Sequence, residues 1–155
     1  MRLTTMSRYG VRAIFDIAYN SAGMTLQMKD ISRRQGISAR YLEQIFHKLK
    51  KANIVESVRG PSGGYVLADD PDKITVGDIC KAVNEPIYPV FCVDPETKSS
   101  EKCRRSEMCP TRLIWKEAGE KITEFFDSIT FISLCERAKR LGIKKDVKHP
   151  FDYSI

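Results

Sequence analysis

The stretch IVESVRGPSGGYVL, residues 54–67, decides the fold of this chain. Residues 54–58 are rich in β-branched side chains, residues 59–64 are dense in turn formers, and residues 65–67 return to strand-forming side chains. This pattern predicts a β-hairpin whose glycine-rich tip lets the backbone approach a partner closely. Arg59 adds a guanidinium group suited to a narrow, negatively charged minor groove of DNA. A plain surface hairpin is the alternative.

Three helices are predicted ahead of the hairpin. Apolar residues recur at helical spacing in residues 7–19 and again in residues 38–49, where Ser38 offers an N-cap hydroxyl. Between them, residues 28–35 form a short helix ended by Gly36, which tolerates the left-handed conformation. Two helices joined by a tight turn match a helix–turn–helix motif, although any three-helix bundle also needs a polar outer face. The polar face of the third helix consists of Arg40, Tyr41, Glu43, Gln44, His47 and Lys48.

The charge of the chain is unevenly distributed. Residues 1–68 hold 11 Lys and Arg against four Asp and Glu, and the remainder of the 155 residues is close to neutral, for a net charge of +6. A basic first half is expected of a nucleic-acid-binding head joined to a sensing or assembly region, and a solvated basic surface is the alternative. No apolar run is long enough to span a membrane, and residues 1–6 lack a signal-peptide hydrophobic run. We therefore expect a cytoplasmic protein with no membrane partner.

The second half predicts an assembly region. Residues 75–83 form a helix that closes the head, and residues 111–129 form a long helix with apolar side chains close to a heptad seam. Such a helix needs a partner surface, either its own head or a second copy in a two-fold dimer, which would pair two reading helices on palindromic DNA. A further helix covers residues 131–141, and a basic tail follows that contains His149.

The predicted fold class is therefore mainly α with a small β-hairpin. A winged helix–turn–helix head covers residues 1–84, and a cysteine-containing loop covers residues 85–110. The dimerisation helix and C-terminal helix cover residues 111–142, and the tail covers residues 143–155.

Three of the five cysteines lie in the predicted loop. Cys92, Cys103 and Cys109 are spaced C-x10-C-x5-C, whereas Cys80 and Cys135 sit in helical patterns, where they are expected to be buried. Thiolates favour iron–sulfur clusters and zinc, and the lack of a C-x2-C pair disfavours zinc. Nucleotide-binding and hydrolase motifs are absent, so we expect no enzyme. Unligated thiols, a thiol redox enzyme and a zinc-stabilised interaction protein are the alternatives.

Several short stretches carry a family resemblance: MRLT at residues 1–4, SRY at 7–9, DIS at 30–32, QGIS at 35–38, YLEQ at 41–44, SVRGPSGGY at 57–65, and Trp115. The chain resembles the IscR-type iron–sulfur cluster regulators, which belong to the Rrf-two family of winged-helix repressors, from its first residue to about residue 134. The resemblance implies a homodimer whose third helix enters the major groove and whose wing arginine enters the minor groove. A cluster held by loop cysteines would alter its affinity for double-stranded DNA.

Carried over position by position, the resemblance implies that Cys92, Cys103 and Cys109 are the cluster ligands. It also implies that Glu43 helps to discriminate between classes of DNA site, and a carboxylate accepts from cytosine. The expected DNA contacts are Ser38, Arg40, Tyr41, Glu43, Gln44, Arg59, Gly60 and Ser62.

Two positions depart from the family pattern. The family carries a histidine ligand three residues after the third cysteine, where this chain has Arg112, which is protonated and cannot ligate iron. Asp94, Glu107, a residue of the partner or a small molecule could supply the fourth ligand, and either a 2Fe-2S or a 4Fe-4S cluster is admissible. Arg40 stands where the best-known member carries a smaller residue, so the preferred base sequence is expected to differ.

The expected function is a cluster-sensing transcription regulator, a repressor of iron–sulfur cluster assembly genes. The runner-up is a repressor that responds to nitric oxide or iron through a labile four-iron cluster.

Overall fold

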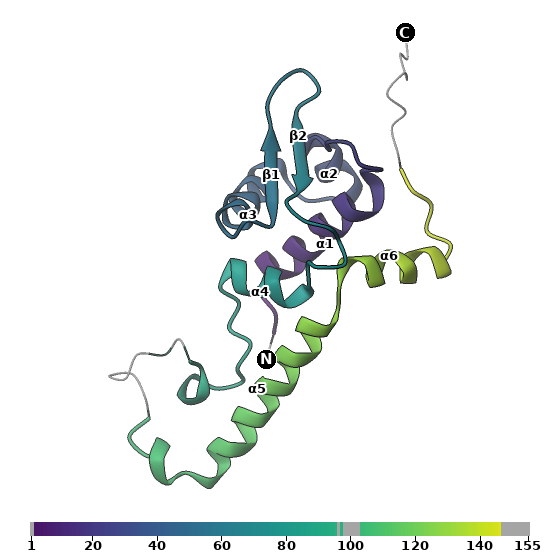
Figure 1. Ribbon diagram of the computed structural model, residues 1–155. Helices are drawn as coiled ribbons and strands as arrows, with labels where there is room; N and C mark the ends of the chain where they lie inside the picture. Colours follow the sequence, from purple (N-terminus) through teal and green to yellow (C-terminus); the bar gives the residue numbers. More distant parts are fainter. Residues whose placement is uncertain (1, 96, 98–102, 147–155) are drawn as a thin grey trace.

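The structure is a computed structural model that describes residues 2–95, 97 and 103–146. The main elements, drawn in Figure 1, are α1 (Thr5–Asn20), α2 (Met28–Gln35), α3 (Ala39–Lys51), β1 (Val55–Val58), β2 (Gly64–Leu67), α4 (Val76–Val83), α5 (Pro110–Ser128) and α6 (Phe131–Arg140). Two short 3-10 helices, η1 (Phe91–Val93) and η3 (Ser106–Met108), lie in the segment predicted to be irregular. The predicted order of helices and hairpin is confirmed, with ends shifted by one or two residues.

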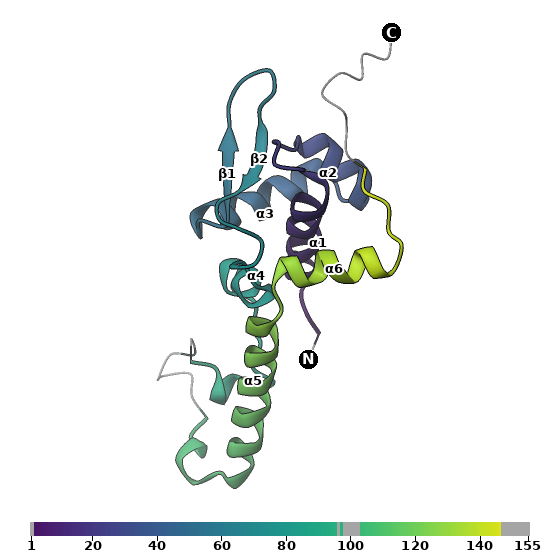
Figure 2. The ribbon, with the colours of Figure 1, turned by 45° about the vertical axis from the view of Figure 1, so that its right-hand side comes forward.

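Helix α1 lies in the middle of the head and contacts α2, α3, α4 and α6 (Figures 1 and 2). Its buried face meets those of α3, α4 and α6, which also carry buried residues at three- and four-residue spacing, while α2 contributes Ile31. The most deeply buried side chains come from six different elements, so one core joins them. They are Ile14, Ile17, Ile31, Leu42, Ile45, Phe46, Leu49, Val55, Ile79 and Phe131.

The start of the chain is fastened to the end of α4. Thr4 caps α1 by accepting a hydrogen bond from the backbone N–H of Ser7. The buried carboxylate of Glu85 accepts a hydrogen bond from the backbone N–H of Thr4 at 3.0 Å and from the hydroxyls of Thr4 and Ser7. Glu85 therefore ties the N-terminal end of α1 to the segment that follows α4.

A buried polar network attaches the helix–turn–helix unit to α1. Asp16 is 0% exposed, and its carboxylate accepts hydrogen bonds from both Nε and Nη2 of Arg34, the latter at 2.7 Å. Gln35 and Asn20 donate to the same carboxylate. Gly36 then takes a φ of 62° and ends α2, as predicted. The carboxylate of Asp16 thus fixes the end of α2, just before the turn to α3, on α1.

The hairpin is supported on both sides of β2. Strand β1 pairs antiparallel with β2, while Leu26 pairs with Tyr65 on the opposite edge through hydrogen bonds of 3.0 and 2.8 Å. A Cβ atom at Gly64 would lie 2.4 Å from the carbonyl oxygen of Leu26, so this close approach requires glycine. The hydroxyl of Thr25 donates to the carbonyl of Ser62 at 2.6 Å and holds the tip of the wing.

Helix α5 extends away from the head, as Figures 1 and 2 show. Its C-terminal end is fixed to α4, where Asp127 forms an ion pair of 2.9 Å with Lys81. Gly77 makes this approach possible, because a Cβ there would lie 1.8 Å from Oδ1 of Asp127. Farther along α5, the ring of Tyr88 packs against Gly119. The helix therefore contacts α4 at its C-terminal end and Tyr88 at Gly119, and most of its other residues are exposed or half-buried.

The tail predicted from residue 143 has no regular secondary structure over residues 143–146, but these residues pack on α1 and α2. The hydroxyl of Tyr19 donates to the carbonyl of Ile143 at 2.6 Å, and the backbone N–H of Asp146 donates to Asn20. Asp146 also pairs with Arg33 of α2 at 2.6 Å. The rest of the tail, with His149, and the polar stretch at residues 98–102 lie outside the described residues.

Candidate nucleic-acid interface and cysteine site

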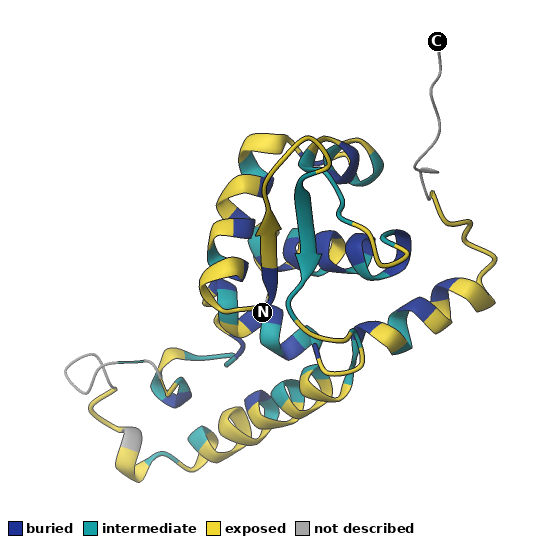
Figure 3. Ribbon diagram, turned by 45° about the horizontal axis from the view of Figure 1, so that its top comes forward, coloured by how far each residue is buried: buried dark blue, intermediate teal, exposed yellow. Residues whose placement is uncertain are grey.

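The outer face of α3 is exposed along its length. Arg40, Glu43, Gln44 and His47 are exposed, while the apolar side of the same helix is buried, a division that Figure 3 shows by colour. These four residues, with Met6 and Lys48, line a groove of about 550 Å³. Ser38 caps the helix by accepting from the backbone N–H of Tyr41 at 3.4 Å. The structure thus brings most of the predicted α3 contacts onto one surface.

Tyr41 differs from the other predicted contacts because it is half-buried. Its ring packs edge-on against Tyr9 of α1, with ring centroids 5.9 Å apart. Arg12 lies over the Tyr9 ring at 5.4 Å and donates to the side chain of Gln35 at 3.2 Å. Tyr41 therefore also orients α3 on α1, a function that its place in the sequence did not indicate.

The wing lies beside α3 and is linked to it. Lys50 in the last turn of α3 donates to the hydroxyl of Ser57 in β1 at 2.6 Å. Arg59 is exposed directly after β1, Gly60 has a φ of 114°, and a Gly63-to-Gly60 hydrogen bond of 2.9 Å closes the tip. The predicted residues Arg59, Gly60 and Ser62 therefore all lie at the exposed tip.

The three loop cysteines lie between η1 and the start of α5. Cys92 belongs to η1 and Cys109 is the N-cap residue of α5, both half-buried, whereas Cys103 is exposed. Arg112 does not face them as a ligand would, because its Nε donates to the backbone carbonyl of Cys92 at 3.2 Å. This contact ties the first cysteine to the helix that begins at the third.

The surroundings of Cys109 favour its thiolate form. A hydrogen bond with the side chain of Thr111, whose Oγ1 is 3.2 Å from Sγ, lowers the pKa of the Cys109 thiol below its ordinary value. The backbone N–H of Arg112 and the charge of Arg105 act in the same direction. Within the described parts of the loop and its surroundings, no three His, Cys, Asp or Glu side chains lie close enough to hold a metal ion.

Cys80 and Cys135 are buried, as predicted, with 1% and 5% of their surface exposed. Burial raises the pKa of the Cys80 thiol to about 11, and it also raises that of Cys135. A protonated, inaccessible thiol packs as a small apolar group. The structure thus separates these two cysteines from the three in the loop.

The apolar stripe of α5 is only partly covered. Ile122, Phe126 and Ile129 of the predicted seam are half-buried against the rest of the chain, but Trp115 and Phe125 are exposed. Leu113 and Ile114 are also exposed, by 66% and 61%. The rest of the chain therefore covers part of the apolar side of α5, and an exposed apolar surface remains near the cysteine loop.

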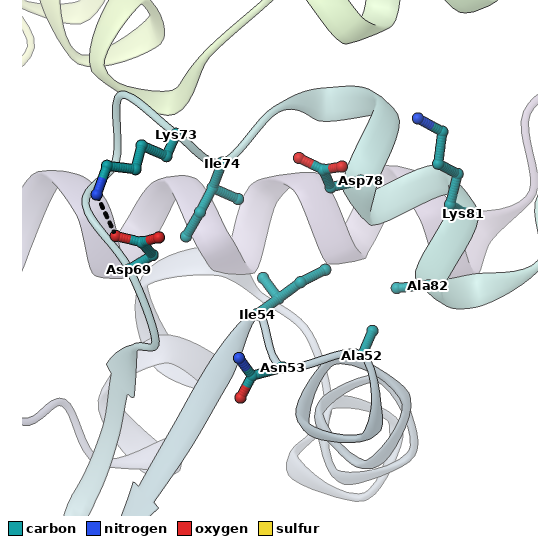
Figure 4. A pocket seen from close by; sticks show the side chains of 9 residues that line it. All are labelled: Ala52, Asn53, Ile54, Asp69, Lys73, Ile74, Asp78, Lys81 and Ala82. Carbon is teal, nitrogen blue, oxygen red and sulfur yellow. Dashed lines mark hydrogen bonds and ion pairs between the residues drawn. The ribbon is translucent and has the colours of Figure 1, made fainter.

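A cavity of about 430 Å³ lies between the end of α3 and α4 (Figure 4). Its ionic side chains are already engaged: Lys73 pairs with Asp69 at 3.0 Å, and Asp78 forms the capping box of α4. Lys81 at its rim pairs with Asp127. We assign no chemistry to this cavity.

Comparison with known proteins decides the family. The family model Rrf2, described as an iron-dependent transcriptional regulator, matches residues 3–137. The chain belongs to the Rrf2 family. Its members are regulators, so the expectation that this chain is a transcription regulator rather than an enzyme is confirmed.

Named relatives of this Rrf2 protein include HTH-type transcriptional regulators IscR. That of Citrobacter koseri is 38% identical over 152 residues, which are 98% of this chain and 90% of the relative. That of Erwinia tasmaniensis is 42% identical over 143 residues, which are 92% and 84% of the two chains.

Solved structures of the same architecture confirm the winged-helix fold. T. potens IscR matches with a TM-score of 0.74 at 33% identity, over 94% of this chain and 93% of that one. CymR, the global cysteine regulator of B. subtilis, matches with a TM-score of 0.70 at 31% identity, over 88% and 98%. In the part of this Rrf2 chain that the structure describes, no helix is long and apolar enough to cross a membrane.

The residues that support the exposed face of α3 and the wing of this Rrf2 protein were not predicted from the sequence. Thr25 holds the wing tip, Tyr9 packs behind Tyr41, and Asp16 holds the helix–turn–helix. Each of these residues contacts a residue that is distant in the sequence, so no local sequence pattern predicts the contact. The available signal was Asp16, an acidic residue beside the apolar positions of α1, because a buried carboxylate requires a partner.

Proposed function

We propose that this Rrf2 protein is a homodimeric DNA-binding regulator that senses an iron–sulfur cluster and represses genes for cluster assembly. The observation that carries the proposal is the presence, in one chain, of an exposed reading surface and a loop of three thiols joined to it by α5. We assign DNA binding to residues 1–84, cluster binding to residues 85–110 and dimerisation to residues 111–142.

Helix α3 is proposed to enter the major groove, with base and backbone contacts from Ser38, Arg40, Tyr41, Glu43 and Gln44. The wing is proposed to place Arg59 in the minor groove while Gly60 and Ser62 lie along the DNA backbone. The exposure of these groups and the Lys50–Ser57 link between helix and wing support a single reading surface. Arginine is favoured in narrow minor grooves because the potential there is strongly negative.

The proposed partner of α5 is a second copy of the chain. Trp115, Phe125, Leu113 and Ile114 are exposed on α5, and large exposed apolar patches mark interaction sites. A two-fold dimer buries the same patch of both copies and sets two α3 helices on a palindromic operator.

Cys92, Cys103 and Cys109 fit an iron–sulfur cluster in donor chemistry, because they are three thiols of one loop and the pKa of one is lowered. They would hold the cluster, which when bound makes the protein responsive to iron supply and oxidants. Arg112 orients the Cys92 segment and cannot serve as the fourth ligand, for which Asp94 and Glu107 remain candidates.

The proposed coupling runs through α5. Residues of η1, which include Cys92, contact α5, and α5 ends against α4 of the head. A cluster held by the three cysteines would fix their positions relative to α5 and so change the relative positions that the two heads can adopt. A coupling free energy of about 1 to 3 kcal/mol is enough to change DNA affinity roughly 5- to 150-fold.

Anaerobic purification, with Mössbauer spectroscopy and iron and sulfide analysis per monomer, tests the sensor. Equal iron and sulfide are expected, and Cys92→Ala is expected to abolish loading while Cys135→Ala, outside the loop, retains it. Full iron and sulfide in Cys92→Ala would remove Cys92 from the ligand set, and a colourless or zinc-bound protein would contradict cluster sensing.

Operator binding tests the wing. We expect Arg59→Ala to weaken binding by about 1 to 3 kcal/mol, whereas Arg140→Ala, an exposed arginine at the end of α6, has little effect. Equal affinities for the two variants in fluorescence anisotropy would contradict the wing assignment.

The presence of Arg112 in place of the family's histidine supports a second candidate function: a repressor that responds to nitric oxide or iron through a labile four-iron cluster. Without the nitrogen ligand of the family pattern, the cluster would be held less firmly. Exposure of the loaded protein to nitric oxide, followed by Mössbauer spectroscopy and operator binding, distinguishes the two. Loss of a four-iron signal together with release of DNA supports this candidate, and a stable two-iron signal opposes it.

A further inference from the structure

We infer that Arg40 reads a guanine in each half of the DNA site and so sets the base preference of this protein. The inference rests on the proposed function, because it requires α3 to enter the major groove. It goes further by naming the base and the side chain that selects it.

The position of Arg40 suits contact with a base. It is the second residue of α3, two residues after the N-cap Ser38, and its side chain is exposed. In helix–turn–helix proteins the N-terminal residues of the recognition helix contact base edges. The apolar residues Leu42 and Ile45 fix the rotation of the helix by burial, so Arg40 is directed away from the core.

Arg40 also retains its full hydrogen-bonding capacity. Neighbouring arginines of the head are used within the chain: Arg12 donates to Gln35, Arg34 is paired with Asp16, and Arg33 is paired with Asp146. In the described ranges 2–95, 97 and 103–146, Arg40 has no hydrogen bond or ion pair. Its guanidinium is therefore available to a ligand without first breaking an internal contact.

The neighbours of Arg40 favour a base edge over a phosphate. Glu43 lies one turn along the same exposed face, and no ion pair joins it to Arg40 among the described residues. A carboxylate is repelled by phosphates but accepts a hydrogen bond from the N4 amine of cytosine. Gln44, beside it, is uncharged and pairs with bases or backbone. A helix face of this composition is better suited to contact base edges in the major groove than the phosphates that line it.

Guanine is the base that matches a guanidinium. Guanine presents two acceptors, O6 and N7, in the major groove, and arginine donates two parallel hydrogen bonds to them. Adenine presents an amine in place of O6, so one of the two bonds is lost and a donor faces a donor. Lysine offers a point charge without this fork and discriminates less well.

Selection of binding sites from a random duplex pool tests the inference, using the wild-type dimer, Arg40→Ala and Arg40→Lys. We expect one guanine per half-site to lose its selection in Arg40→Ala and to weaken in Arg40→Lys, while other positions are unchanged. Replacing that guanine in the wild-type site should cost roughly 5- to 150-fold in affinity, and the variant should not distinguish the bases. Lys51→Ala, an exposed cation at the other end of α3, is the matched control and should leave the guanine preference intact.

Duplexes with 7-deazaguanine at the selected position isolate the proposed contact, because they lack only the N7 acceptor. Wild type should bind them more weakly, and Arg40→Ala should bind them as it binds guanine. Uniform weakening by Arg40→Ala with unchanged base preference would overturn the inference and make Arg40 a phosphate contact. Failure of the wild-type protein to select any sequence would instead contradict the proposed function.

Discussion

Asp16 and Asp127 are both carboxylates paired with a cation, but they lie in very different surroundings. Asp16, in the head, is fully buried and accepts hydrogen bonds from three side chains, while Asp127, where α5 joins α4, is 40% exposed and pairs with Lys81. We call residues 86–128 the arm. Gly119 is the buried residue of α5, whereas Trp115 and Phe125 of the same helix are exposed.

The difference indicates where each region obtains its stability. The head buries its apolar side chains and pairs its internal charges within one chain, so it holds one geometry for reading DNA. The arm leaves apolar side chains and thiols exposed or half-buried, so under the proposed function its geometry would depend on a second copy and a cofactor. A sensor needs both properties, because a rigid arm could not transmit a change and a soft head could not select a sequence.

The buried ion pair provides the largest contrast. Asp16→Asn removes the close counter-charge of the buried Arg34 and leaves it only the longer contact with Asp146 at 3.9 Å, so it is expected to lower the free energy of unfolding by about 3 to 5 kcal/mol. Asp127→Asn removes an exposed pair and should cost about 0 to 1 kcal/mol. Urea denaturation followed by circular dichroism measures both, and similar losses would remove the distinction between head and arm.

Alkaline pH should weaken the head through Cys80. Burial raises the pKa of this thiol from 9.0 to about 11, so the folded state holds a proton that the unfolded chain releases first. The contribution of Cys80 is fully present below pH 9 and is lost as pH rises to 11, for about 2 kcal/mol in total. Unfolding curves of wild type and Cys80→Ala between pH 8 and 11 isolate it. The variant should lose less stability over this range, and parallel curves would contradict the assignment.

The junction between head and arm should depend on Gly77. Gly77→Ala places a Cβ against Asp127 and displaces its side chain, at an expected cost of about 1 to 2 kcal/mol. Adding Asp127→Ala should recover most of that loss, because the obstructing side chain is gone. Thermal denaturation of wild type, the two single variants and the double variant gives a double-mutant cycle. Additive losses of unfolding free energy would mean that Gly77→Ala does not act through the side chain of Asp127.

The smallest effect is expected from the exposed pair that Arg33 forms with Asp146, whose side chains are 58% and 48% exposed. Arg33→Ala should change the free energy of unfolding by about 0 to 1 kcal/mol. Arg34→Ala, at the adjacent position but 8% exposed, should cost several times more because it strands the buried Asp16. Equal effects in urea denaturation would mean that burial does not separate these two arginines.

Local patterns were sufficient for most of the fold. Gly36 ends α2 and Ser38 caps α3 because both act within a few residues of their own position. The spacing of Leu42, Ile45 and Leu49 determines which side of α3 is outside. The residues expected to touch DNA are on the surface for the same reason, although Tyr41 lies half inside.

Long-range contacts were beyond such reasoning. The 126-residue separation between Asn20 and Asp146 leaves no periodic trace, so the start of the tail could not be predicted to pack on α1. Arg112 could be identified as a departure from the family ligand pattern, but its contact with the carbonyl of Cys92 could not. The sequence likewise showed that α5 is apolar without showing which of its side chains the chain itself covers.

The sequence by itself determined the helices, the wing and the separation of three loop cysteines from two buried ones, because helix periodicity, turn chemistry and residue burial are local preferences. Only the tertiary structure decided how these parts are held. It placed Asp16 beneath the helix–turn–helix, Thr25 behind the wing and Arg112 on the cysteine loop. These contacts depend on which distant segments lie side by side once the core is packed. The apolar pattern predicts which faces are buried, but it does not predict which polar side chains form contacts between those segments.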